Sequence, residues 1–250
     1  PSSVYVTYYK NSSNNCDLDF GIHTQCWGHF AEGGLSSSIT LGDSCNGDIE
    51  PLPPPLPQAV LHQGSTLATI DYDGDGDKDL VVGDISSNSL KLLINGGNSE
   101  KAVITQLIDD FPTSNPVDIY VYPDGFFIDV DHDGDKDFIA STAEIALSGG
   151  RNVNNAWYYE NSSSTSATDF KFVQENFLMD KSIDVGGGAA PHFYDYDHDG
   201  DKDLLIGSFI EKTDAFNLEA KLYLYENIGD STGSIFKLKW RRTYRFLDGY

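Results

Sequence analysis

The sequence lacks any long hydrophobic run: no stretch approaches the roughly 18 consecutive apolar residues that a membrane-spanning helix needs. We therefore predict no membrane insertion. Helical periodicity is missing as well, and the only short candidate, 143–147, is expected to be a loop. GxSxG, HExxH and Walker motifs are missing, as is a GxGxxG that opens a helix. Without a catalytic motif, we expect a protein that is not an enzyme.

Basic residues are also scarce. Lys and Arg number 16 against 39 Asp and Glu, which gives a formal net charge of −23. A surface of this sign repels phosphate backbones and anionic lipid, so we expect no nucleic-acid partner, and an anionic membrane is a poor partner on electrostatic grounds. Such acidity suits an extracellular protein, secreted or attached to a cell surface, in a medium that contains calcium.

Only three cysteines are present, Cys16, Cys26 and Cys45, all near the start of the chain. One disulfide among them is expected, with its pairing left open. The alternative is a zinc site, which needs a further ligand such as His23 or His29. The chain opens at Pro1 without a signal peptide or initiator methionine, so we expect mature protein or a fragment.

Three acidic stretches stand out: DYDGDGDKDL from residue 71, DVDHDGDKDF from 129 and DYDHDGDKDL from 195. Each places Asp at positions 1, 3, 5, 7 and 9, Gly at position 6 and Lys at position 8. Crowded carboxylates repel one another by about 1 kcal/mol per close pair even in water. A hard cation with six to eight oxygen ligands offsets that cost, so each loop is a candidate Ca²⁺ site. The fifteen candidate residues are Asp71, Asp73, Asp75, Asp77, Asp79, Asp129, Asp131, Asp133, Asp135, Asp137, Asp195, Asp197, Asp199, Asp201 and Asp203.

Within each loop, we assign side-chain ligands to positions 1, 3, 5 and 9, and the carbonyl of position 7 completes the shell. The position 7 carboxylates of Asp77, Asp135 and Asp201 are then expected to face solvent. The position 6 glycine lets the chain turn sharply over the ion. An EF-hand is excluded because position 12 is apolar in all three copies. The alternative, a merely solvated acidic turn, explains one such loop better than three in the same register.

Apolar stretches rich in β-branched and aromatic residues flank every loop, so the loops are expected to cap β-hairpins. A second element is a strand ending in Asn, at 5–11, 90–95, 157–161 and 222–227, and its last three asparagines are 66 residues apart. A third element, at 102–105, 169–173 and 236–240, is expected to lead each repeat. Four strands per period correspond to one propeller blade.

These motifs resemble the FG-GAP or VCBS repeats of calcium-binding β-propellers, as found at the head of integrin α chains. The resemblance covers about residues 58–227. More loosely, the chain resembles bacterial surface proteins exported by type IX secretion. The resemblance implies an all-β propeller of four-stranded antiparallel blades, three bound Ca²⁺ ions, and an extracellular protein or glycan as ligand.

We expect residues 1–250 to form a single propeller region of about three and a half blades. Its expected parts are the end of a blade (1–11), a blade with a Cys- and Pro-rich insertion (12–95), two blades (96–161 and 162–227) and the start of another (228–250). Partner blades would come from the rest of a longer chain; alternatively, the terminal strands combine and close a small ring. The proline tract 51–57 suits an extended surface crossing or, alternatively, a PxxP ligand.

Three functions remain open at this stage. The first is non-catalytic adhesion or binding of a protein or glycan; the second is the propeller of a secreted polysaccharide-degrading enzyme; the third is a spacer without a ligand beyond calcium. The tryptophans 27, 157 and 240 suit blade cores more than sugar stacking. His132, His192 and His198 are expected to be surface residues.

Overall fold

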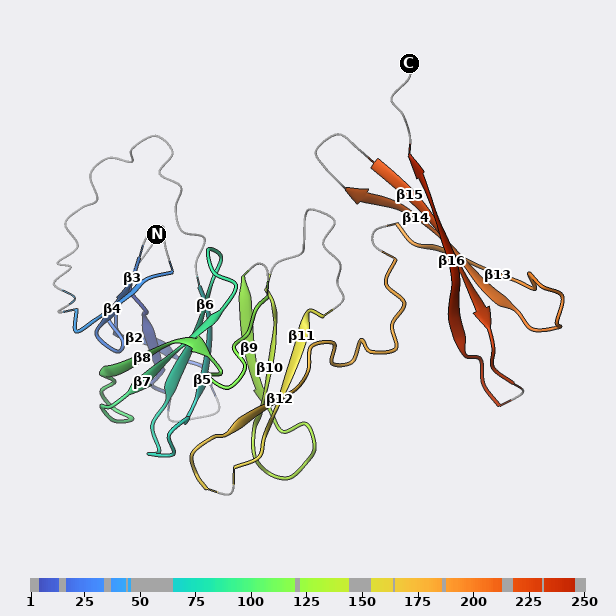
Figure 1. Cartoon of the computed structure of the whole chain (residues 1–250). Helices are drawn as coiled ribbons and strands as arrows, with labels where there is room; N and C mark the ends of the chain where they lie inside the picture. Colours follow the sequence, from blue (N-terminus) through green and yellow to red (C-terminus); the bar gives the residue numbers. More distant parts are fainter. Residues whose placement is uncertain are drawn as a thin grey trace, which may run out of the picture. The chain divides into compact units, whose positions relative to one another are not determined.

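The structure, a computed structural model, describes residues 5–13, 17–33, 37–43, 45, 65–119, 122–143, 154–163, 165–185, 188–212, 218–230 and 232–245. These residues form strands, turns and loops, and none of them is helical (Figure 1). The all-β expectation is confirmed. Within these ranges, no segment combines helical structure with the length and hydropathy of a membrane span. Cys16, the proline tract 51–57 and most of 143–147 lie outside the described residues.

Three four-stranded antiparallel sheets dominate the fold, and in each the strands follow the order of the chain. The first contains β5 (Ser65–Ile70), β6 (Asp79–Asp84), β7 (Leu90–Asn95) and β8 (Ile104–Phe111). The second contains β9 (Pro123–Ile128), β10 (Asp137–Thr142), β11 (Ala156–Asn161) and β12 (Phe170–Gln174). The third contains β13 (Ala190–Tyr194), β14 (Asp203–Lys212), β15 (Leu218–Asn227) and β16 (Phe236–Arg245).

Two antiparallel strand pairs precede these sheets. They are β1 (Tyr8–Asn11) with β2 (Phe20–Thr24), and β3 (Phe30–Glu32) with β4 (Ile39–Leu41). Among the described residues, no sheet closes on itself. The chain forms two compact units: one comprises Pro1–Ile145 and Asn155–Leu178 and holds β1–β12, and the other comprises Ala146–Asn154 and Met179–Tyr250 and holds β13–β16.

The strand that ends in Asn organises each sheet's last turn. Its side-chain Oδ1 accepts hydrogen bonds from the backbone N–H groups two and eight residues later, at 2.9–3.3 Å. This arrangement recurs at Asn11, Asn95, Asn161 and Asn227. The chain therefore reverses directly after each Asn and pairs the next strand with it.

Those hydrogen bonds correct the expected strand order. The element at 102–105, 169–173 and 236–240 was expected to lead the following repeat, but it is the fourth strand of the sheet before it. In each sheet the Asn pairs with the residue nine positions later, for example Asn161 with Phe170. The sheets consequently begin one strand later than the boundaries 12–95, 96–161 and 162–227.

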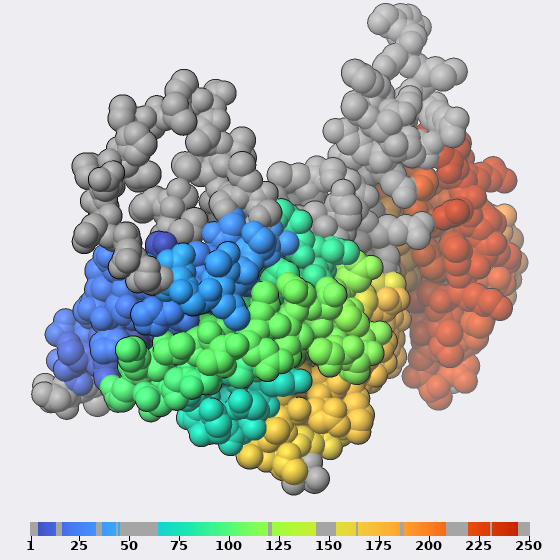
Figure 2. All heavy atoms as spheres, turned by 60° about the vertical axis from the view of Figure 1, so that its left-hand side comes forward, coloured from blue at the N-terminus to red at the C-terminus, as the bar shows by residue number. Residues whose placement is uncertain are grey.

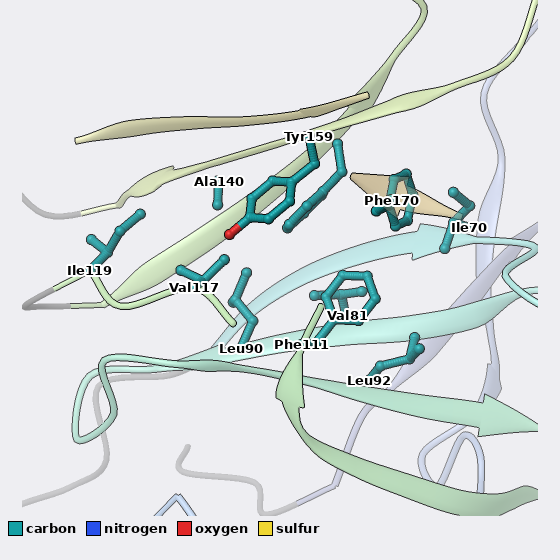
Figure 3. Packing of buried hydrophobic residues seen from close by; sticks show 11 residues of the cluster. Ile70, Val81, Leu90, Leu92, Phe111, Val117, Ile119, Ala140, Tyr159 and Phe170 are labelled. Carbon is teal, nitrogen blue, oxygen red and sulfur yellow. The ribbon is translucent and has the colours of Figure 1, made fainter. Parts of the chain in front are cut away.

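The first and second sheets pack through one apolar cluster (Figure 3). Phe138 lies at its centre, fully buried, with its ring centroid 5.2 Å from that of Phe111 and 5.3 Å from that of Tyr159. The Tyr159 hydroxyl donates to the Asn115 carbonyl at 3.0 Å, so the buried phenol keeps a partner. The cluster comprises Ile70, Val81, Leu90, Leu92, Phe111, Val117, Ile119, Phe138, Ala140, Tyr159 and Phe170.

The other face of the first sheet is covered by the N-terminal strands, which lie against the residues around β8 in Figure 2. Because side chains alternate along a strand, Leu80 and Val82 point away from Val81 and pack with Phe30. The Ile104 N–H donates to the Gly28 carbonyl at 2.8 Å across this contact. Strand β6 is buried along its whole length for this reason, since both of its faces are covered.

The third sheet has its own small core. Val185, Leu204, Ile206 and Tyr223 are buried, and Phe236 packs against them. The hydroxyl of Ser208, which is also buried, donates to the Val185 carbonyl at 2.6 Å and ties the segment before β13 to β14. This sheet repeats the strand order of the other two within the second unit.

Candidate metal sites in the acidic loops

All three acidic loops cap β-hairpins, as the sequence predicts. Residues 71–79 join β5 to β6, 129–137 join β9 to β10, and 195–203 join β13 to β14. The strands pair up to the base of each loop, where position 9 faces the residue before position 1. The same local scaffold thus presents the aspartates three times.

The position 6 glycines adopt backbone angles that other residues avoid. Their φ values are +95° at Gly76, +101° at Gly134 and +102° at Gly200. A Cβ at any of them would meet nothing within 4 Å, so the backbone angle, and not space, requires glycine. The sharp turn expected over the loop is present in all three.

Position 4 also has a positive φ, but its residue differs between the loops. Gly74 occupies it in the first loop at φ +80°, and a Cβ there would collide with Ser166. The Thr168 N–H donates to the Tyr72 carbonyl at 2.8 Å, so the turn between β11 and β12 lies directly on this loop. The other two loops carry exposed histidines at position 4, as expected for surface residues.

The position 9 aspartates are the most buried residues of the loops, between 0% and 2% exposed. Both oxygens accept backbone hydrogen bonds: Oδ2 from the N–H of position 2, and Oδ1 from the N–H of the Asn that ends the third strand. These donors are Tyr72 and Asn95 for Asp79, Val130 and Asn161 for Asp137, and Tyr196 and Asn227 for Asp203, all at 2.7–2.9 Å. Each such carboxylate joins the loop to the rest of its sheet, a role that sequence reasoning missed.

The position 1 aspartates each accept an N–H bond on Oδ2 from the position 6 glycine, at 3.0–3.3 Å. In the first loop, the Oδ1 of Asp71 also accepts the Gly74 N–H, at 2.9 Å. In the other two loops, the Oδ1 atoms of Asp129 and Asp195 are buried and have no hydrogen-bond donor among the described residues. A buried acceptor left without a partner costs about 1–3 kcal/mol, and a cation would relieve that cost.

Carboxylate oxygens converge in every loop. Three of them lie within 4.8 Å of one another in each cluster: Asp71, Asp73 and Asp79; Asp129, Asp131 and Asp137; Asp195, Asp197 and Asp199. A cation about 2.3–2.6 Å from each oxygen fits such a spacing. The donors are all hard oxygens without thiolate or imidazole, a set that suits Ca²⁺ or Mg²⁺ better than zinc. Each loop could therefore hold a metal ion.

The clusters contain positions 1 and 3 in every loop, and position 5 or 9 in addition. The position 5 carboxylates also accept the position 7 N–H, at 2.9–3.0 Å, which fixes their orientation. Position 7 belongs to no cluster among the described residues. Its carboxylate is exposed at Asp135 and Asp201, as expected.

Asp77 departs from that expectation, because it is only 5% exposed. It lines a cavity together with residues 6–8 and 26–29 of the N-terminal segment, which packs over the first sheet alone. Burial, followed by the charges of Asp75 and Asp79, raises the pKa of Asp77 from 3.8 to about 6. Burial also raises the pKa of Asp79, against the opposing effect of its two N–H bonds. Negative charge in this loop is therefore costly without a cation.

The third loop carries a cation of its own. The Lys239 Nζ lies 3.4 Å from the Asp197 Oδ2 and 3.1 Å from the Glu226 Oε1, and 5.6 Å from the centre of the Tyr196 ring. Lys239 comes from β16 and partly neutralises this cluster. Nothing in the loop motif signals it, because the lysine lies far along the chain.

The cysteines and tryptophans that were considered for zinc or sugar binding have structural roles. Cys26 and Cys45 form a disulfide with their Cα atoms 6.1 Å apart. His29 lies beside them, but bonded sulfurs offer no thiolate, so the zinc alternative does not hold for this pair. Trp157 packs against the cluster between the first and second sheets, and Trp27 against the cluster around Phe30.

Comparison with protein-family models, characterised proteins and solved structures finds no match to this chain. Nothing in these comparisons connects it with a catalytic family.

Proposed function

We propose that each acidic loop binds one Ca²⁺ and that the protein is a non-catalytic, extracellular calcium-binding module of the β-propeller type. The observation that carries this proposal is that three carboxylates converge in every loop, at positions 1 and 3 and at either 5 or 9, with a buried and unpartnered position 1 oxygen in two of the loops. Ca²⁺ accepts irregular shells of oxygen ligands, whereas Mg²⁺ demands near-ideal octahedral geometry. Loops of alternating carboxylates and backbone carbonyls suit the larger ion.

Calcium has a structural role in this proposal. The ligands of each site come from one hairpin, so the ion offsets the repulsion within that loop and fixes the hairpin against the Asn strand through position 9. Dissociation constants on the order of 10⁻⁴ to 10⁻³ M, typical of extracellular modules, suffice outside the cell. An extracellular location is proposed for this reason.

The proposed propeller is inferred from the order and packing of the observed sheets. Four antiparallel strands recur in one order, and the first two sheets pack face to face, as neighbouring blades of a propeller do. The FG-GAP or VCBS resemblance supports the same architecture. On this scaffold, we propose adhesion or binding of a protein or glycan as the biological role.

Two substitutions in the second loop test the ligand register. Asp133→Ala removes the position 5 carboxylate, which the sequence assigns as a ligand but which lies outside the group of Asp129, Asp131 and Asp137 that converges in this loop. If that assignment holds, the substitution is expected to lower stability in calcium by about 1–3 kcal/mol, because the remaining carboxylates hold the ion less well. Asp135→Ala, two residues later, removes an exposed carboxylate and is expected to change stability by less than about 0.5 kcal/mol. Urea unfolding with and without calcium measures both, and equal losses would refute the assigned register.

A further inference from the structure

A cavity of about 570 Å³ lies in the first unit, between the N-terminal segment and the first sheet. One side is formed by residues 6–8, 23–24 and 26–29, and the other by β5, the end of the first acidic loop and the turn at 98–102. Its volume falls within the roughly 300–1,000 Å³ of small-molecule pockets. The carboxylates that converge in this loop, those of Asp71, Asp73 and Asp79, do not line the cavity. Asp77, which does line it, is assigned to the calcium shell through its backbone carbonyl, so its carboxylate is not used as a calcium ligand.

Asp77 distinguishes this cavity from a chance gap. Its side chain lines the cavity, is 5% exposed, and its Oδ1 has no hydrogen-bond donor among the described residues. The residues at the same loop position, Asp135 and Asp201, are exposed to water instead. The last torsion of an Asp side chain is broad, so rotation about it changes which of the two oxygens lies nearer the cavity. A ligand with hydroxyl donors would satisfy this carboxylate.

Aromatic rings line the opposite side. Tyr8 is 41% exposed, and its ring meets that of His23 edge to face, with centroids 5.5 Å apart. Trp27 packs partly into the core and also lines the cavity. Rings of this kind offer flat apolar surface with a polar edge, which suits the C–H faces and hydroxyl rim of a sugar.

The charges of the lining favour a neutral ligand. Two carboxylates, Asp77 and Glu100, are balanced by two ammonium groups, Lys78 and Lys101. Glu100 is in addition paired with Lys10, at 3.2 Å. A strongly charged ligand of either sign would therefore meet like charge as well as opposite charge.

We propose that this cavity binds a short neutral saccharide, with Asp77 accepting hydrogen bonds from its hydroxyls and with Tyr8 and Trp27 packing on its ring faces. The inference rests on the ligand-binding half of the proposed function and names its site and ligand class. It does not depend on the identity of the metal in the loops.

Isothermal titration with maltotriose, cellotriose and triacetylchitotriose, in calcium-containing buffer, tests it. At least one of these neutral trisaccharides is expected to bind the wild-type chain and Asp135→Asn equally, whereas Asp77→Asn and Tyr8→Ala each weaken binding about tenfold or more. Asp135→Asn is the matched control, since it makes the same change at the same loop position without a cavity. Tyr8→Ala removes an exposed ring and is expected to leave the fold intact. It therefore tests the cavity even if Asp77→Asn fails to fold.

Three results would overturn the inference: no binding of any of the trisaccharides up to about 10 mM, equal binding by Asp77→Asn, or tighter binding of the charged analogue trigalacturonic acid. The calcium-dependent shift of the melting temperature, recorded on the same samples, separates this failure from failure of the calcium proposal. A shift without saccharide binding would leave calcium binding in place and remove only the cavity's role.

Discussion

Replacing Asp137 with alanine is expected to destabilise the first compact unit by about 2–6 kcal/mol, even in a metal-free buffer. The carboxylate is 1% exposed and accepts the N–H groups of Val130 and Asn161 at 2.9 Å each. Its removal leaves both donors without their partner: the Asn161 N–H is buried and the Val130 N–H is partly buried. An orphaned donor in such a place costs about 1–3 kcal/mol. This loss of stability comes from the hydrogen bonds that join the second acidic loop to β11. In calcium, the loss of a metal ligand would add to it.

The free energy of unfolding is measured by urea titration in EDTA, with tryptophan fluorescence as the signal. The dependence of that free energy on urea concentration, the m-value, should be the same in the variant and the wild type. Asp135→Ala is the control from the same loop, because its carboxylate is exposed. If both variants lose equally little stability without metal, the hydrogen bonds that Asp137 accepts from Val130 and Asn161 contribute nothing to stability. The position 9 carboxylate would then act only as a metal ligand.

Chelation of calcium is expected to lower the melting temperature by several degrees, and added Ca²⁺ is expected to restore it. In millimolar calcium, about one to ten times the proposed dissociation constants, each bound ion stabilises the folded state by about 0.4–1.4 kcal/mol, and three ions add. For chains of this size, about 1 kcal/mol moves the melting temperature by 2–4 °C. Without the ion, the carboxylates of each loop repel one another at short range.

Magnesium provides the comparison for this experiment. The same concentration of Mg²⁺ is expected to restore less stability, because its shell is smaller and stricter. An identical melt in EDTA and in millimolar calcium would remove the structural role of the ion.

The acidic loops and their hairpins could be predicted because their determinants are local. Alternating aspartates, one glycine at position 6 and flanking β-branched residues specify the turn within about ten residues. The position 6 glycines do have the positive φ that such a turn needs. The Asn strands were likewise visible from their 66-residue spacing.

Features that depend on distant parts of the chain could not be read in this way. A period gives the spacing of repeats but not the strand on which a sheet begins, and here the Asn side-chain hydrogen bonds decide that the fourth strand belongs to the preceding sheet. Asp77 lines a cavity whose other side comes from residues about 50 to 70 positions earlier in the chain. Lys239 reaches Asp197 from another strand. A partial signal existed for the position 9 role: in both later repeats, 24 residues separate that Asp from the Asn.

Equilibrium dialysis against about 10 mM calcium, which nearly fills sites with dissociation constants of 10⁻³ M or below, counts the bound metal per chain and so measures directly whether the acidic loops bind the ion. About three Ca²⁺ are expected per wild-type chain and about two in Asp129→Ala, because this substitution removes the buried and unpartnered oxygen of the second loop. A chain that binds no calcium under these conditions, or an Asp129→Ala variant that binds as many ions as the wild type, would contradict this expectation.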